Sequence, residues 1–358
     1  MASDNLSSSP ARRIDVGILG ATGMVGQQFM KQLAVHPWFR PAWLGASERS
    51  AGRSYRDAAP WRLSTPMPVE LQDARVDACT PGRAPHLVFS ALDADAAKDI
   101  EPAFAAAGHL VVSNARSYRM DSAVPLLIPE INPEHLQLIE RQRRERAWKG
   151  ALVTNPNCST VVLAMVLAPL RQFGLKSVVV TTLQAVSGAG YPGVASLDIL
   201  SNVIPFISGE EEKMESETQK ILGTFAEESV RPHGVVVSAH TTRVPVVDGH
   251  TEMVSIALES GPSIEDVKAA LAQFRGKPQA LGLPSAPRSP IVVTDAPARP
   301  QPRLDVERDG GMTVTVGRVR PCRLLGYKLA ALGHNTVRGA AGAAILNAEL
   351  MAADGIFD

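Results

Sequence analysis

The chain has 358 residues, 45% of them hydrophobic, and its 36 basic and 36 acidic side chains leave no net charge. A neutral chain has no overall field that attracts nucleic acid or anionic lipid, so we expect neither as a partner. The length exceeds what one hydrophobic core comfortably supports, so two domains are expected.

We expect neither a membrane span nor a secretory signal in segment 1–13. No apolar run reaches the roughly 18 residues of a membrane span, and segment 1–13 is polar and serine-rich, which predicts a flexible tail. The three cysteines, Cys79, Cys158 and Cys322, form an odd set without metal-type spacing. They favour a reduced, cytoplasmic compartment and no bound metal.

The first predicted elements are a strand at 14–19, a glycine-rich turn at Gly20–Gly26 and a helix from Gln27 to Val35. Glycines permit a tight turn and a close approach of backbone to a pyrophosphate, whose charge the helix N-terminus stabilises. This order of elements predicts a dinucleotide site, although a plain strand-to-helix turn would leave the same pattern.

The next predicted strand, 42–47, ends where the adenosine ribose of a bound dinucleotide would lie. An NAD enzyme usually places an acidic residue there, to hold the ribose 2′-hydroxyl. Ser47 and Arg49 can instead hold a 2′-phosphate, which favours NADP, whereas Glu48 between them keeps NAD open. An ordinary solvated loop is the other interpretation.

Strands are predicted at 87–90 and 109–114, with a helix at 94–107 between them. This alternation predicts a parallel, doubly wound sheet. The loop after the second strand carries Arg116 and Arg119, which can meet an anion at the C-terminal edge of the sheet or simply face solvent.

A cysteine lies between a predicted buried strand at 151–154 and a predicted buried helix at 161–168. Asn157 or Ser159 can cap the helix, which puts Cys158 at its first turn. There the helix dipole and unpaired N–H groups can lower the thiol pKa from about 8.5 towards neutral and favour the nucleophilic thiolate. The alternative is a buried structural cysteine.

The second half begins with a predicted strand, 177–186, that carries Gln184 and leads into the glycine-rich loop Ser187–Gly193. Such a loop favours backbone packed close to a ligand, although a wide turn fits nearly as well. A helix follows from Glu210 to about Gly223. Its Glu210 and Lys213 share a face, as a binding pair or as an ordinary solvated helix start.

A predicted strand at 235–246 contains Arg243 and is followed by Asp248-Gly249, a strong hairpin signal. His250 would then begin the returning strand, with Arg243 on the opposite limb. Together with a candidate nucleophile, His250 is a candidate general base. The remaining predicted elements are a helix at 264–274, a proline-rich surface loop at 276–303, a strand at 313–319, a strand or helix start at 325–332, and a last helix from about Asn335.

Taken together, these residues resemble the aspartate-semialdehyde dehydrogenase family over nearly the whole chain. The features that carry the resemblance are, in chain order, Gly20–Gly26, Asn155–Thr160, Gln184 before Ser187–Gly190, Glu210 with Lys213, Arg243 through His250, and Asn335–Gly342. Each is modest alone, and their order and joint presence make the resemblance specific.

The resemblance implies NADPH-dependent reduction of L-aspartyl 4-phosphate to L-aspartate 4-semialdehyde, with release of phosphate, in the biosynthesis of lysine, methionine, threonine and isoleucine. It implies that Cys158 forms a thioester, that His250 is the acid/base, and that Gln184 orients the acyl group. The implied substrate contacts are Arg243 at the α-carboxylate, Glu210 near the amino group, Lys213 and Arg119 at the phosphate (Arg116 being the less favoured candidate), and Asn157 beside the nucleophile.

The resemblance also implies where NADP binds. The implied contacts are Gly20, Thr22, Gly23, Met24, Val25, Ser47, Arg49, Ser90, Ser187, Gly188 and Asn335. The chemistry fits independently, because the substrate brings a carboxylate, an ammonium and a phosphate, and the chain offers charges of matching sign.

The expected fold is therefore α/β, with an N-terminal Rossmann-type doubly wound parallel sheet and an α+β catalytic and dimerisation domain. We expect the NADP-binding domain at 14–157, completed by a C-terminal helix at 334–358, the catalytic domain at 158–333, and a homodimer or homotetramer. Malonyl-CoA reductase and N-acetyl-glutamyl-phosphate reductase are the alternatives within the superfamily, and an inactive NADPH-binding sensor is the alternative outside enzymes. Neither alternative substrate carries a free ammonium for Glu210.

Overall fold

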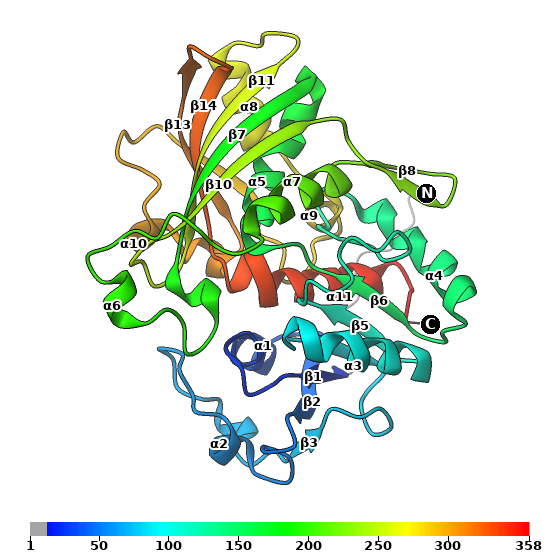
Figure 1. Cartoon of the computed structure of the whole chain (residues 1–358). Coiled ribbons are helices and arrows are strands. Elements are labelled where there is room, and N and C mark those ends of the chain that lie inside the picture. The colour runs from blue at the N-terminus through cyan, green and yellow to red at the C-terminus, as the bar shows by residue number, and fades with distance from the viewer. Residues whose placement is uncertain (1–12, 358) are drawn as a thin grey trace.

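The computed structural model describes residues 13–357 (Figure 1). The flexible tail predicted at 1–13 lies outside these residues, except for Arg13, whose guanidinium donates hydrogen bonds to the carbonyls of Leu33 and Phe39. Among the described residues, no helix is both long enough and apolar enough to cross a membrane.

The first half of the chain forms a six-stranded parallel sheet in the order β3-β2-β1-β4-β5-β6. Its strands are β1 Ile14–Leu19, β2 Phe39–Ala46, β3 Val76–Ala78, β4 Leu87–Ser90, β5 Leu110–Ser113 and β6 Ala151–Thr154, and its helices are α1 Met24–Ala34, α2 Tyr55–Ala58, α3 Ala94–Ala107 and α4 Leu138–Arg146. The strand order reverses between β1 and β4, as in dinucleotide-binding folds, and this confirms the predicted doubly wound sheet.

The second half forms a mixed six-stranded sheet in the order β10-β7-β11-β14-β13-β12 and a small β8-β9 pair. Its strands are β7 Leu175–Gln184, β8 Thr224–Ala226, β9 Ser229–Arg231, β10 Val236–Arg243, β11 His250–Leu258, β12 Ile291–Thr294, β13 Val314–Cys322 and β14 Gly326–Gly333, and its helices are α5 Cys158–Leu167, α6 Ser196–Ile199, α7 Glu210–Ile221, α8 Ile264–Gln273, α9 Lys277–Leu281 and α10 Pro302–Asp305. Helices α5, α7 and α8 pack on one face of this sheet.

The opposite face of the second sheet is open. Val179, Val236 and Met253 are exposed on it, although their strands also carry buried apolar residues on the helix-covered face. Exposed large apolar side chains on adjacent strands indicate a surface that another protein chain can cover.

The C-terminal segment returns to the first half of the chain. A π-helical turn, Val337–Ala341, leads into α11, Gly342–Ala353, whose residues are buried as far as Met351. Ala344, Ile345 and Leu346 share one hydrophobic cluster with residues of β1, β2 and α1. In Figure 1 the red α11 lies between the two sheets.

Two local predictions were wrong. The turn at Asp248-Gly249 does not close a hairpin, because β7 lies between β10 and β11, parallel to the first and antiparallel to the second. A turn signal specifies the local bend, whereas the pairing partner is decided by the whole sheet. The segment 276–303 is not a plain loop, since β12 pairs in parallel with β13 inside it.

Candidate active site

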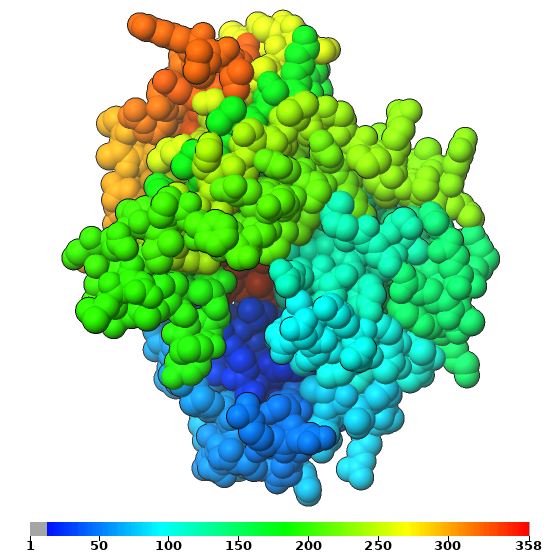
Figure 2. Space-filling model, in the orientation of Figure 1, coloured from blue at the N-terminus to red at the C-terminus, as the bar shows by residue number. Residues whose placement is uncertain are grey.

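The face of the molecule in Figure 2 is hollowed between the two halves of the chain. The green segment of the second half and the cyan segment of the first half flank the hollow, and the dark blue N-terminal and dark red C-terminal segments lie at its floor. The hollow therefore brings together segments from opposite ends of the described residues.

Cys158 and His250 meet although 92 positions separate them in sequence. Sγ of Cys158 lies 3.2 Å from Nε2 of His250. Asn157 caps α5 by accepting hydrogen bonds from the N–H groups of Ser159 and Thr160, which places Cys158 at the first helical position as predicted. His250 is fully buried at the start of β11. This pairing satisfies the geometry of a thiol nucleophile beside an imidazole.

The backbone sets the tautomer of His250. Nδ1 accepts a hydrogen bond from the N–H of Ala185 at 3.1 Å, so Nδ1 carries no proton. The neutral ring must then hold its proton on Nε2, directed at the sulfur of Cys158. His250 therefore meets the sulfur as a hydrogen-bond donor, which a sequence cannot specify.

The prediction of a low pKa for the Cys158 thiol was wrong. Burial, with a smaller contribution from the negative charge of Glu210, raises the pKa of Cys158 to about 12. Burial likewise lowers the pKa of His250 to about 3, and the nearby Arg243 adds to this. Desolvation exceeds the effect of the helix terminus, so both groups are neutral near pH 7.

Two glycines allow the backbone to press against this pair. A Cβ on Gly188 would lie 2.9 Å from Nη1 of Arg243 and 3.1 Å from Cε1 of His250. A Cβ on Gly339 would lie 2.6 Å from Cβ of Cys158. The loop after β7 and the C-terminal segment thus form two walls of the site, and side chains at these positions would push the reacting groups apart.

Glu210 lies among hydrogen-bond donors. Its carboxylate accepts from Nδ2 of Asn157 at 2.8 and 3.0 Å, from Nζ of Lys213 at 2.7 Å and from Nε2 of Gln184 at 3.5 Å. Burial alone would raise the pKa of Glu210, but the charge of Lys213 and these hydrogen bonds together lower it. The structure therefore brings four predicted site residues into one contact group next to Cys158.

Arg243 is connected to the same centre through Ala185. It pairs with Gln184 in the β10-β7 register, and Nη1 donates to the carbonyl of Ala185 at 2.7 Å. Burial lowers its pKa, although the pKa of a guanidinium is high enough that it stays charged. A buried cation at this place can hold a carboxylate.

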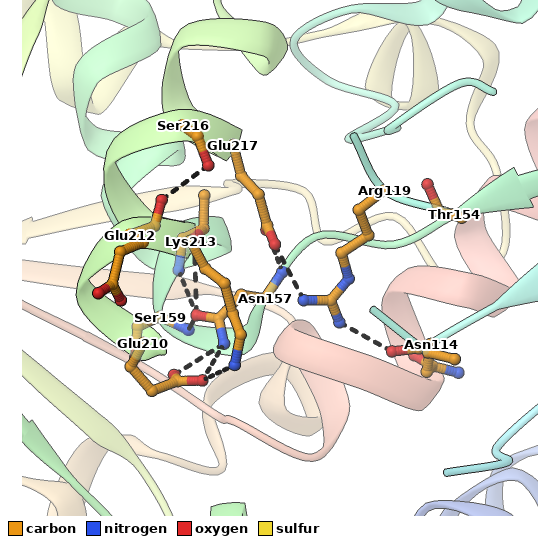
Figure 3. A network of polar contacts seen from close by, with 12 residues as sticks. Asn114, Arg119, Thr154, Asn157, Ser159, Glu210, Glu212, Lys213, Ser216 and Glu217 are labelled. Carbon is orange, nitrogen blue, oxygen red and sulfur yellow. Dashed lines mark hydrogen bonds and ion pairs between the residues drawn. The ribbon is translucent and has the colours of Figure 1, made fainter. Parts of the chain in front are cut away.

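Of the two arginines in the loop after β5, only Arg119 turns inward. Arg119 is buried and Arg116 is exposed. Nη1 of Arg119 pairs with the carboxylate of Glu217 at 3.1 Å, and Nη2 donates to the carbonyl of Asn114 (Figure 3).

Glu217 and Lys220 are functional candidates that the sequence analysis missed. Both are buried on α7, and their spacing from Glu210 and Lys213 was the signal that could have found them. Positions 210, 213, 217 and 220 share one helix face with alternating charge.

The predicted dinucleotide contacts surround the N-terminus of α1. Gly20 has φ +74°, and a Cβ there would lie 2.7 Å from the carbonyl oxygen of Ala91. Gly23 is the N-cap of α1 and has no side chain to cap it, and Thr22, Met24 and Val25 are partly exposed beside it. First-turn N–H groups have no acceptor within their own helix, so this terminus fits a pyrophosphate.

The other predicted cofactor residues occupy two places. Ser47 and Arg49 are exposed directly after β2, and Ser90 ends β4. Asn335 donates to Oγ of Ser187 at 2.7 Å and accepts from the N–H of Gly249 at 2.8 Å. Asn335 therefore connects the glycine-rich loop to the start of β11, where His250 lies.

A dinucleotide-type sheet joined to a domain in which a thiol contacts an imidazole defines a class of dehydrogenases with a cysteine nucleophile. Residues 15–139 match the family model described as "Semialdehyde dehydrogenase, NAD binding domain", and residues 167–338 match "Semialdehyde dehydrogenase, dimerisation domain".

Relatives cover nearly the whole chain. The aspartate-semialdehyde dehydrogenase of Archaeoglobus fulgidus is 52% identical over 95% of this chain and 98% of its own length, and that of Cryptococcus neoformans is 49% identical over 97% and 99%. The crystal structure of the Candida albicans enzyme with NADP has a TM-score of 0.89 and 45% identity over 96% of this chain and all of its own. The chain belongs to the aspartate-semialdehyde dehydrogenase family, which confirms the resemblance.

Proposed function

We propose that this protein is an NADP-dependent aspartate-semialdehyde dehydrogenase. It reduces L-aspartyl 4-phosphate to L-aspartate 4-semialdehyde and phosphate, a step towards lysine, methionine, threonine and isoleucine. The observation that carries the proposal is the 3.2 Å contact between Cys158 and His250, inside a group of buried residues whose charges match those of the substrate.

The substrate charges have partners of opposite sign at the site. Arg243 holds the α-carboxylate, Glu210 attracts the ammonium, and Arg119 and Lys213 hold the phosphate. Gln184 and Asn157 act with them, since both already hydrogen-bond Glu210 and can orient the acyl group next to the sulfur. These contacts hold the acyl carbon next to the sulfur of Cys158, so the reaction does not pay the entropy of bringing two free reactants together.

The first chemical step forms a thioester, and no other base has to keep the thiol proton. The sulfur of Cys158 bonds to the acyl carbon, the bond from that carbon to the phosphate oxygen breaks, and the thiol proton leaves with the phosphate as hydrogenphosphate. Nε2–H of His250 donates a hydrogen bond to the sulfur of Cys158 while negative charge develops on that sulfur. The role of His250 is therefore narrower than that of a free base, because Ala185 occupies Nδ1.

NADPH, when bound, supplies the hydride that reduces the thioester to the aldehyde. The N-terminus of α1 would hold its pyrophosphate, through Gly20, Thr22, Gly23, Met24 and Val25. Ser47 and Arg49, exposed directly after β2, would hold the 2′-phosphate, and Ser90, Ser187, Gly188 and Asn335 would supply further cofactor contacts. The Candida albicans relative crystallised with NADP supports this choice.

Cofactor binding and catalysis are assigned to different halves of the chain. We place the cofactor domain at 14–157 with the C-terminal segment 334–358, and the catalytic domain at 158–333. The open face of the second sheet is the surface for a homodimer or homotetramer, supported by its exposed Val179, Val236 and Met253 and by the match to a dimerisation-domain family. Three free thiols suit a cytoplasmic enzyme.

The proposal is tested by NADPH formation from aspartate semialdehyde, phosphate and NADP, with malonyl-CoA plus NADPH as the competing assay. Cys158→Ser should abolish turnover and keep NADP binding. Glu210→Ala and Arg243→Ala should raise the KM for aspartate semialdehyde by more than about tenfold, the value of a charged hydrogen bond, and leave the KM for NADP nearly unchanged. Turnover of malonyl-CoA alone, or unchanged kinetics in both variants, would refute the substrate assignment.

A further inference from the structure

A buried carboxylate next to the pocket has no role in the proposed reaction. Glu217 lies on α7, two turns after Glu210, and the residue is only 1% exposed. We propose that Glu217 is a positioning residue that holds the phosphate-binding Arg119 against the N-terminus of the catalytic helix. This inference rests on the proposed roles of Arg119 and Cys158.

Glu217 joins two segments that are remote in sequence. Oε1 accepts from Nη1 of Arg119 at 3.1 Å, across 98 positions, and Oε2 accepts from the backbone N–H of Asn157 at 2.6 Å, across 60 positions (Figure 3). Both partners are donors. A carboxylate can accept hydrogen bonds from both donors. An amide has one acceptor oxygen, and its NH₂ group would face the second donor without forming a hydrogen bond.

The segment on the Asn157 side is the one that orients the nucleophile. Asn157 caps α5, its Nδ2 holds Glu210, and Cys158 follows it directly. A displacement of Asn157 would therefore move the nucleophile and the ammonium site together.

The segment on the Arg119 side is held at several points. Nη2 of Arg119 donates to the carbonyl of Asn114, while Nε is buried and has no partner among the described residues. Nζ of Lys220 donates to the carbonyls of Arg119, Asp121 and Val124 at 2.7 to 2.9 Å, and burial lowers its pKa to about 8. One turn of α7 thus fixes both the guanidinium and its loop.

The test compares Glu217→Gln, which keeps the volume but can satisfy only one donor, with Glu217→Asp, which keeps both acceptors. Glu349→Gln is the matched control, because Glu349 is an equally buried carboxylate that pairs with His36 at 2.7 Å outside the pocket. We expect Glu217→Gln to raise the KM for phosphate at least tenfold, with the KM for NADP within twofold of wild type, and Glu217→Asp to recover part of the loss. Glu349→Gln should leave both KM values within twofold.

A double-mutant cycle shows whether Glu217 acts through Arg119. Adding Glu217→Gln to Arg119→Gln should change the KM for phosphate less than twofold further, since the residue to be positioned is gone. Full additivity, or a Glu217→Gln enzyme with wild-type phosphate kinetics, would overturn the proposal. If Glu217→Gln does not fold, Glu217→Asp and its combination with Arg119→Gln give the same comparison.

A readout without turnover separates this inference from the proposed function. If the wild type does not reduce NADP with aspartate semialdehyde and phosphate, the proposed function is refuted. The rate of Cys158 alkylation by iodoacetamide then still tests whether Glu217 positions the N-terminus of α5. Freeing the N–H of Asn157 loosens the end of α5, so Glu217→Gln should be alkylated at least threefold faster than both wild type and Glu349→Gln. Equal rates in the three proteins would overturn the positioning role.

Discussion

Gly339→Ala tests how tightly the C-terminal segment holds the nucleophile. The new Cβ would lie 2.6 Å from Cβ and 2.9 Å from Cα of Cys158, where ordinary contacts begin at 3.4 Å. The two segments must therefore separate by about 0.8 Å, and Cα cannot rotate away as a flexible side chain could. Overpacking of this kind costs about 1–3 kcal/mol, and a misplacement near 1 Å can cost about 100-fold in rate.

We therefore expect Gly339→Ala to lower kcat about 10- to 100-fold and to lower the free energy of unfolding by about 1–3 kcal/mol. The assays are steady-state kinetics with aspartate semialdehyde and urea unfolding. Gly234→Ala is the control, because nothing lies within 4 Å of a Cβ built there. A kcat within twofold of wild type would show that Cys158 does not need the contact distance at Gly339.

Two further predictions concern His250. Gly188→Ala places a Cβ 2.9 Å from Nη1 of Arg243 and 3.1 Å from Cε1 of His250. We therefore expect kcat to fall about tenfold and the KM for aspartate semialdehyde to rise, with Gly234→Ala as the control. Unchanged kcat and KM would contradict the close packing. Burial lowers the pKa of His250 from 6.5 to about 3, so its contribution to stability is present above pH 6.5 and is lost as the pH falls towards 3. Between pH 7 and pH 5 the free energy of unfolding, measured in urea, should therefore fall by about 2 kcal/mol less in His250→Asn than in the wild type. His240→Asn, at an exposed position, is the control and should follow the wild type. Parallel pH dependence in wild type and His250→Asn would contradict the burial argument.

Much of the fold was determined by local sequence. Apolar runs of four to six residues separated by glycine turns and helical patterns predict a buried parallel sheet, and each such strand was found within a few residues of its expected bounds. The helix start at Cys158 was also local information, because the cap is formed by the adjacent Asn157. These features depend on short-range geometry, which a stretch of sequence carries by itself.

Tertiary structure decided the features that require distant segments to meet. The contact of Cys158 with His250, the insertion of β7 between β10 and β11, and the contact of Glu217 with Arg119 each depend on which segments the whole fold brings together. The thiol pKa is the sharpest case. The residues next to Cys158 predict the helix start that would lower this pKa. The desolvation that outweighs it comes from the surrounding protein, which covers Cys158 only when the chain is folded.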